Sequence, residues 1–364
     1  MKEKRRRSPF AKEKMSFEEL FLKLSITLLI AVVFIVCFLS FDGLKVFEKA
    51  NYVDDFAGYV FQAHTIDVEN GDAFILKLPK NKTLLIDCGD SEYEERVVSY
   101  IKQYLAKENL SQIDYFVMTH SDSDHIGNAS AIIENFNVIN VYRPKKYSQD
   151  EGQFIPLEKD YQIDAGVDYN KAIISAYQND CNLIFSERGL KISLENCSIE
   201  FLSPMLDSYS DDNNYSAVLM IKYYSLKMLF VGDAGESIEG KLIDEYGDGL
   251  KADILKVGHH GSKTSTSEEF LQMVSPTYAL LSCSENSSTL PNSEVISRIE
   301  NSGVKLLSTM KMGSFAFTIE GNSIVYIGEK GYFNFWALIF AILLICVVVL
   351  FKIPFSTKKE AKKV

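Results

Sequence analysis

Residues 119–127 read Thr-His-Ser-Asp-Ser-Asp-His-Ile-Gly and follow the apolar run DYFVMT at 114–119. Such a run is typical of a buried strand. Four side chains that bind divalent cations lie within six residues: His120, Asp122, Asp124 and His125. A lone His-x-Asp is commonly a helix cap, but this density of imidazoles and carboxylates at a strand end predicts a metal site.

Two further strand ends carry the same kinds of side chain. The run ADILKV at 252–257 leads into GHHGS, which contains His259 and His260, and KMLFVGD at 227–233 ends on Asp233. Ends of neighbouring strands can converge, so we expect these side chains to meet. Carboxylates gathered in this way raise one another's pKa, and bound divalent cations relieve that repulsion.

The pattern of the rest of the chain predicts an α/β fold with sheets covered by helices. Short β-rich runs separated by turn residues predict the strands, and amphipathic periodicity predicts helices at 236–246, 267–273 and 292–301. The region 144–185 is less regular and is expected to be an insertion. His64 lies inside a predicted strand and is expected to be structural.

Two uncharged runs flank the central part of the chain, at 24–41 and 331–351. Each approaches the ~20 apolar residues of a membrane-spanning helix, and a signal peptide is the alternative for the first run. Basic residues before the first run and after the second predict cytoplasmic ends. The predicted order is a basic cytoplasmic tail, a span, an extracellular domain, a span and a basic cytoplasmic tail, at 1–23, 24–41, 42–330, 331–351 and 352–364.

Charge and cysteine content narrow the function classes. The net charge is −11 overall, and −19 for 24–351, which argues against a broadly basic nucleic-acid groove. Basic residues do occur close in sequence to the metal motifs, where they form either a phosphate track or a solvated face: Arg143, Lys145, Lys146, Lys256 and Lys263. The alternatives for Cys181 and Cys197 are a disulfide and two separate thiols, and separate thiols are expected.

Taken together, these motifs resemble those of the metallo-β-lactamase superfamily, and most of all the branch that forms the extracellular hydrolase domain of ComEC-type competence proteins. The segments TIDVENGDAFIL, LLIDCG, THSDSDHIG, NNYSAVLMI, LFVGD and LKVGHHGSKTS occur in the family's order between about 60 and 328. The resemblance implies an αββα sandwich with a binuclear site at one edge of its paired sheets. Its departures include Leu290, where relatives often have a histidine before proline.

The resemblance also implies roles for the site residues. It assigns as ligands of two divalent ions, zinc or manganese, the residues His120, Asp122, Asp124, His125, Asp233 and His259. Asp233 is expected to bridge the two ions, and Asp124 and His260 are expected to be catalytic. Either member of the pair His259 and His260 fits the ligand role, and the other one would then donate a proton or bind the oxyanion.

The predicted function is a membrane-anchored metal-dependent hydrolase, acting as a phosphodiesterase or nuclease. Its expected partners are the lipid bilayer and a phosphodiester substrate such as DNA. A cell-envelope phosphodiesterase acting on teichoic-acid substituents is the second interpretation. A tethered binding module with a degenerate site is the third, and Leu290 is the residue that supports it.

Overall fold

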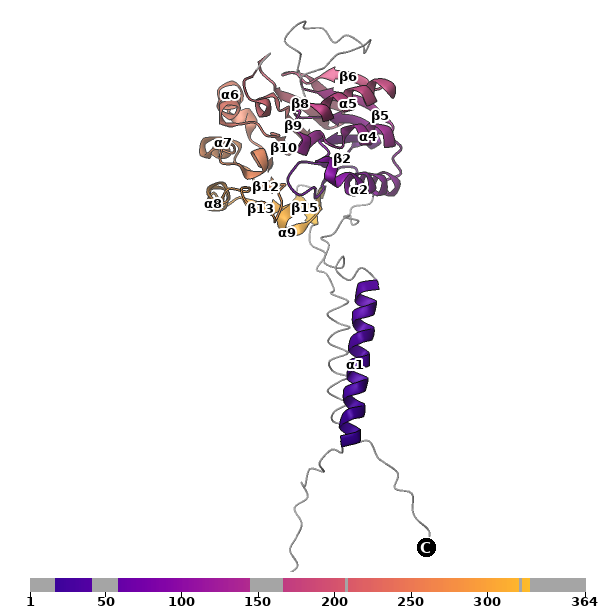
Figure 1. The fold of residues 1–364 in the computed structure, drawn as a ribbon. Coiled ribbons are helices and arrows are strands. Elements are labelled where there is room, and N and C mark those ends of the chain that lie inside the picture. The colour runs from indigo at the N-terminus through magenta and orange to yellow at the C-terminus, as the bar shows by residue number, and fades with distance from the viewer. Residues whose placement is uncertain (1–16, 41–57, 145–165, 207–208, 321–322, 328–364) are drawn as a thin grey trace, which may run out of the picture. The chain divides into compact units, whose positions relative to one another are not determined.

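The computed structural model describes residues 17–40, 58–144, 166–206, 209–320 and 323–327. The chain divides into two compact units, one formed by Met1–Glu48 with Gly331–Val364 and the other by Lys49–Lys330. In the described part of the chain, the first unit contains helix α1 (Phe17–Ser40). The remaining described helices and strands belong to the second unit (Figure 1).

The prediction of a cell-membrane protein with two spans and an outer catalytic domain is wrong. Among the described residues, no helix has both the length and the apolar character needed to cross a membrane. The second predicted span, 331–351, lies outside the described residues.

The described strands of Lys49–Lys330 form two sheets. The first has eight strands in the order β15-β14-β1-β2-β3-β4-β5-β6. Its strands are β1 (Gln62–Thr65), β2 (Phe74–Leu78), β3 (Lys82–Ile86), β4 (Ile113–Val117), β5 (Val138–Arg143), β6 (Asn182–Phe185), β14 (Phe315–Glu320) and β15 (Ser323–Ile327).

The second sheet has seven described strands in the order β13-β12-β11-β10-β9-β8-β7. Its strands are β7 (Lys191–Leu194), β8 (Cys197–Ser203), β9 (Val218–Tyr223), β10 (Leu226–Phe230), β11 (Ile254–Lys256), β12 (Tyr278–Leu281) and β13 (Lys305–Ser308).

Helices cover the outer face of each sheet (Figure 1). The described helices of this unit are α2 (Glu94–Lys107), α3 (Ser123–Ile126), α4 (Ala129–Asn135), α5 (Val167–Gln178), α6 (Glu236–Tyr246), α7 (Glu268–Val274), α8 (Ser293–Asn301) and α9 (Thr309–Met312). One apolar cluster joins α2, α4 and α5 to the first sheet, a second fills the space between the sheets, and a third joins α6, α7 and α8 to the second sheet. The expected αββα sandwich is confirmed.

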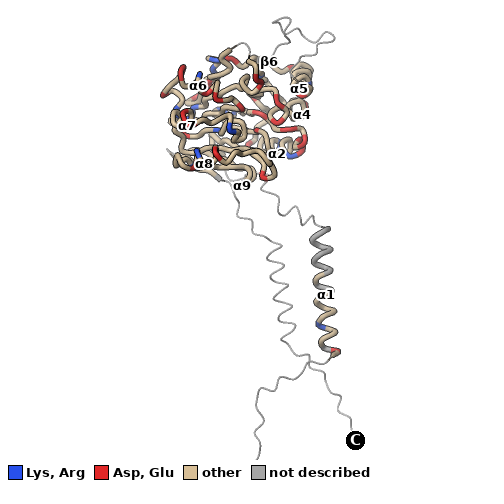
Figure 2. The backbone as a smooth tube through the Cα atoms, turned by 60° about the vertical axis from the view of Figure 1, so that its left-hand side comes forward, with Lys and Arg blue, Asp and Glu red and all other residues tan. Residues whose placement is uncertain are grey.

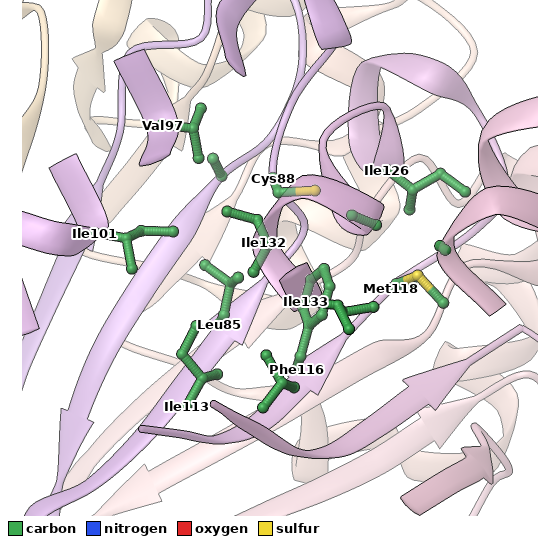
Figure 3. Packing of buried hydrophobic residues seen from close by; sticks show 14 of the residues in the cluster. Leu85, Cys88, Val97, Ile101, Ile113, Phe116, Met118, Ile126, Ile132 and Ile133 are labelled. Carbon is green, nitrogen blue, oxygen red and sulfur yellow. The ribbon is translucent and has the colours of Figure 1, made fainter. Parts of the chain in front are cut away.

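Alternation along each strand explains these layers. On β3, Leu85 faces the helices whereas Leu84 and Ile86 face the other sheet. A strand buried on both faces is therefore apolar throughout. Figure 3 shows Leu85 and Phe116 on the strand side of the first cluster, with Ile132 and other helical side chains packed against them.

Parallel pairing brings the predicted site motifs to one edge. In the first sheet β3 runs parallel to β4, and in the second sheet β10, β11 and β12 are mutually parallel neighbours. The carboxyl ends of parallel neighbours lie at the same edge of a sheet. The segments that follow β4, β10 and β11 carry the predicted ligands, and Asp87 follows β3.

Most predicted elements are found close to their expected bounds, and α6 matches 236–246. The region 144–185 is more regular than predicted, because α5 and β6 extend the first layer and the first sheet; its part 145–165 lies outside the described residues. Cys181 and Cys197 are separate thiols and form no disulfide, in agreement with the expectation.

Candidate metal centre

His125 lies on the short helix α3 and is completely buried. Its Nδ1 is 2.8 Å from Oδ2 of Asp87, the residue that follows β3. Because a carboxylate only accepts hydrogen bonds, Nδ1 carries the proton and Nε2 presents its lone pair. Asp87 also accepts from the backbone N–H and the hydroxyl of Thr119, which fixes the segment between β4 and α3.

His260 reaches the same point from the second sheet. Its Nδ1 lies 3.0 Å from the carbonyl oxygen of Ser282, so this imidazole also points Nε2 inward. Nε2 of His260 is 3.1 Å from Nε2 of His125 and 3.4 Å from a carboxylate oxygen of both Asp124 and Asp233. These four side chains offer ligand atoms that all lie within 4.8 Å of one another.

His120 and Asp122 lie beside this group. The ring centroids of His120 and His125 are 4.1 Å apart, and Nε2 of His120 is 3.6 Å from Oδ2 of Asp122. The His120 ring is completely buried, and its Nδ1 lies 3.1 Å from the Thr119 hydroxyl. Asp122 remains partly open to solvent, with a side chain that is 42% exposed.

His259 occupies a different position from His260. Its Nε2 is 3.6 Å from Oδ2 of Asp233, and its side chain is 29% exposed. The four-residue group contains His260 and not His259, whereas the sequence left open which of the two is the ligand. Both histidines have positive φ in the turn Gly258–Gly261, and their ring centroids lie 6.2 Å apart with the ring planes at 86°.

The charges of the cluster shift its pKa values strongly. Burial alone would lower the pKa of His260, but Asp233, Asp72 and Asp124 together outweigh it and raise that pKa to about 9. Burial also lowers the pKa of His125, but Asp233 and Asp87 together raise it well above its usual value. Burial alone would raise the pKa of Asp233, but His260, His125 and Lys256 lower it well below its usual range. The imidazoles and carboxylates thus stabilise one another's charged forms.

These side chains fit a bound divalent cation. One buried polar atom, Nε2 of His120, has no hydrogen-bond partner among the described residues, and Oδ1 of Asp233 lies 3.1 Å from Nε2 of His125. In addition, two Nε2 lone pairs that face each other at 3.1 Å require a cation or a proton between them. Imidazole and carboxylate are the ligands that zinc and manganese accept.

Three residues that the sequence motifs left without a role lie at the centre of this arrangement. Asp87 orients His125, as described above. Asp72, in the turn between β1 and β2, binds Lys256, the last residue of β11, at 2.6 Å. The motifs GDA and LLID contain these two carboxylates. Their proximity to His125 depends on packing between segments that lie far apart in the chain.

The alternatives of a phosphate track and a solvated face both fail for two of the basic residues. Lys256 is completely buried and bound to Asp72, so it is not on the surface. Arg143 is also buried, with its guanidinium 3.8 Å from the ring centroid of Phe185. Lys263 is exposed, and Lys145 and Lys146 lie outside the described residues.

Comparison with known proteins gives the same family as the motifs. Residues 66–166 and 206–285 match the model of the metallo-beta-lactamase superfamily. The chain is 26% identical over 266 residues to ComE operon protein 3 of Bacillus subtilis (strain 168), which covers 69% of this chain and 32% of that protein. It is 30% identical over 246 residues to Competence protein ComA of Neisseria gonorrhoeae, covering 67% and 30%.

The chain therefore spans about a third of the length of these curated relatives. Among solved structures, it is similar to Igni18, a metallo hydrolase of Ignicoccus hospitalis KIN4/I, with a TM-score of 0.44 and 13% identity. That similarity covers 74% of this chain and 100% of the other.

Proposed function

Because the chain carries a metallo-β-lactamase superfamily domain, we propose that it is a metal-dependent hydrolase that cleaves phosphodiester bonds in nucleic acid. The convergence of His125 and His260, whose Nε2 atoms lie 3.1 Å apart between Asp124 and Asp233, carries this proposal. Packing alone does not explain such a set of donors at the edge of two sheets, since burying several negative charges together costs free energy.

Two cation positions account for all the converging side chains. His120 and Asp122 would hold one cation, Asp124, His125 and His260 would hold the other, and Asp233 would contribute a carboxylate to the same site. This proposal assigns the ligand role to His260, because His260 lies in the group and His259 lies at its rim. Zinc and manganese both suit a site in which imidazoles and carboxylates are mixed.

Divalent cations at such a site supply hydroxide at neutral pH and neutralise charge that develops on phosphoryl oxygens. The protein's own groups do the rest. Asp87 and the Ser282 carbonyl hold the Nδ1 protons of His125 and His260, which keeps both Nε2 atoms directed inward. His259 is partly exposed beside Asp233, and from Nε2 it would give a proton to the leaving oxygen.

Nucleic acid is the proposed substrate because of the relatives. One of them is Competence protein ComA, and competence is the uptake of external DNA. The chain spans about a third of that protein. A phosphodiester also suits the site chemically, since two cations can contact both the attacking and the leaving oxygen of an in-line displacement.

The test is a panel of substrates with defined metals. The full chain, stripped of metal and reloaded with Mn²⁺ or Zn²⁺, should bind two equivalents and cleave single-stranded DNA and a chromogenic phosphodiester. Asp124→Asn and Asp233→Asn should each reduce the cleavage rate by more than about 100-fold, because even residues outside the ligand shell typically account for 10- to 100-fold. Metal content is measured on the same samples by elemental analysis.

Asp253→Asn is the matched control. Asp253 accepts a hydrogen bond from the backbone N–H of Lys227 at the opposite ends of β10 and β11, away from the proposed ligands. This variant should keep its metal content and its cleavage rate. A wild-type chain that binds no divalent metal, or ligand variants that keep full turnover, would contradict the proposed function.

A further inference from the structure

Lys256 is a completely buried lysine directly behind the candidate metal centre. Its Nζ lies 2.6 Å from Oδ2 of Asp72, 3.6 Å from Oδ1 of Asp233 and 3.1 Å from the carbonyl oxygen of Gly232. The ammonium group therefore connects the first sheet, through the turn that carries Asp72, to two residues at the end of β10 in the second sheet. A charge-assisted contact as short as 2.6 Å is a strong one.

Asp72 has a second set of neighbours. Its Oδ1 lies 3.7 Å from Nδ1 of His260, and its Oδ2 lies 3.8 Å from Nδ1 of His125. Asp72 is 1% exposed, and its Oδ1 has no hydrogen-bond partner among the described residues. This carboxylate thus lies behind both inward-pointing imidazoles, on the side away from the proposed cations.

We propose that Asp72 is a positioning residue that holds the Lys256 ammonium away from Asp233, so that Asp233 remains available to the metal ions. The proposal rests on the proposed function, because Asp233 is there a metal ligand. It assigns Asp72 and Lys256 to the metal centre although neither contacts the reacting atoms.

Competition for one oxygen atom is the physical basis. An ammonium ion and a divalent cation are both attracted to Oδ1 of Asp233, which lies 3.1 Å from Nε2 of His125 and 3.6 Å from Nζ of Lys256. The ammonium is 1.0 Å closer to Asp72 than to Asp233, so Asp72 decides where that positive charge lies. Removing the charge of Asp72 would allow Lys256 to move to Asp233 and to block it.

Charge balance supports the same pairing. Five carboxylates lie in and directly behind the site, namely those of Asp72, Asp87, Asp122, Asp124 and Asp233. With one buried ammonium their net charge is −4, which two divalent cations neutralise. Loss of the Asp72 charge alone would leave −3, and loss of Asp72 and Lys256 together would restore −4.

The experiment measures metal affinity in the full chain, by competition with a chromophoric chelator for Mn²⁺ and Zn²⁺. Asp72→Asn should weaken binding by about 10- to 100-fold, the range typical of residues that orient metal ligands. The double variant Asp72→Asn/Lys256→Met removes the competing ammonium as well. It should bind metal more tightly than Asp72→Asn and return to within about tenfold of the wild type.

Asp114→Asn is the control for loss of a buried carboxylate in the same sheet, since Asp114 is buried at 3% exposure and binds Lys82 at 2.7 Å. It should leave metal affinity unchanged. Urea unfolding of the metal-free proteins separates a loss of stability from a loss of affinity.

The possible outcomes separate this inference from the proposed function. If the wild type binds no metal, the proposed function fails. If the wild type binds metal and Asp72→Asn binds it equally well, only the positioning role fails. The role also fails if the double variant binds no better than Asp72→Asn, because a purely structural defect would not be relieved by a second substitution.

Discussion

The imidazole of His64 is held within the first sheet by neutral partners. It is 2% exposed on β1, with Nδ1 2.8 Å from the Tyr100 hydroxyl and Nε2 3.2 Å from Oε1 of Gln62. Burial lowers the pKa of His64 to about 3. The contrast with His260 shows that carboxylate neighbours, and not burial, decide whether an imidazole here is charged.

His64 should make the stability of the fold sensitive to acid. Between pH 6.5 and about 3 the unfolded chain binds a proton at His64 and the folded chain does not, so stability falls as pH falls through this window. The slope attributable to this residue is at most about 1.4 kcal/mol per pH unit. His64→Phe should be less stable at pH 7 but should show a shallower decline of the urea midpoint from pH 6.5 to about 4. Parallel pH profiles for the two proteins would contradict this assignment.

At the scale of elements, the turn between β1 and β2 supports the site through its backbone. The N–H of Asp72 donates to the carbonyl oxygen of Asp124 on α3, which joins this turn to the ligand helix. Gly71 has φ +138°, and a Cβ at this position would overlap that same carbonyl oxygen. Glycine is thus required here by both the backbone conformation and the close approach.

Gly71→Ala should therefore move Asp124 as well as strain the turn. We expect a loss of about 1–3 kcal/mol in the free energy of unfolding, as for overpacked sites, together with weaker binding of Mn²⁺. Gly189→Ala is the matched control, because Gly189 also has positive φ, +87°, but a Cβ added there would meet no other atom within 4 Å. The control should lose some stability and keep its metal affinity; equal effects on metal binding in both variants would refute the role of the turn.

At the scale of the whole molecule, the net negative charge is unfavourable for binding a polyanion such as DNA. The net charge is −11, and acidic positions occur along the whole of the Lys49–Lys330 unit in the view of Figure 2. Two of the basic residues nearest in sequence to the motifs, Arg143 and Lys256, are buried. Binding of nucleic acid should thus depend on the metal centre and not on an extended basic surface.

The salt dependence of DNA cleavage tests this view. A protein that makes 6–10 phosphate contacts loses roughly 10³- to 10⁵-fold in affinity between 50 and 200 mM salt. For this chain we expect kcat/KM on single-stranded DNA to change by less than about tenfold over the same range, with a small chromogenic diester as the salt-insensitive reference. A decline of about 10³-fold or more would demonstrate an extended phosphate-binding surface and would overturn this interpretation.

Local pattern accounts for much of the fold and for part of the site. The apolar runs that became β4, β10 and β11, and the ligand-type residues after them, were recognisable because strand propensity and residue chemistry are local properties. The same holds for the periodicity of α6. The predicted membrane localisation was wrong, since no helix among the described residues is long and apolar enough to cross a membrane.

What the amino-acid sequence by itself determined is an α/β fold with sheets covered by helices, and the order along the chain of the His and Asp residues that are candidate ligands. Only the tertiary structure decided which side chains share the site. Packing of two sheet edges against each other placed His260 inside and His259 at the rim, and brought Asp72 to Lys256 across 184 positions of the chain. Distances between such segments depend on how whole layers pack, and no local pattern encodes them.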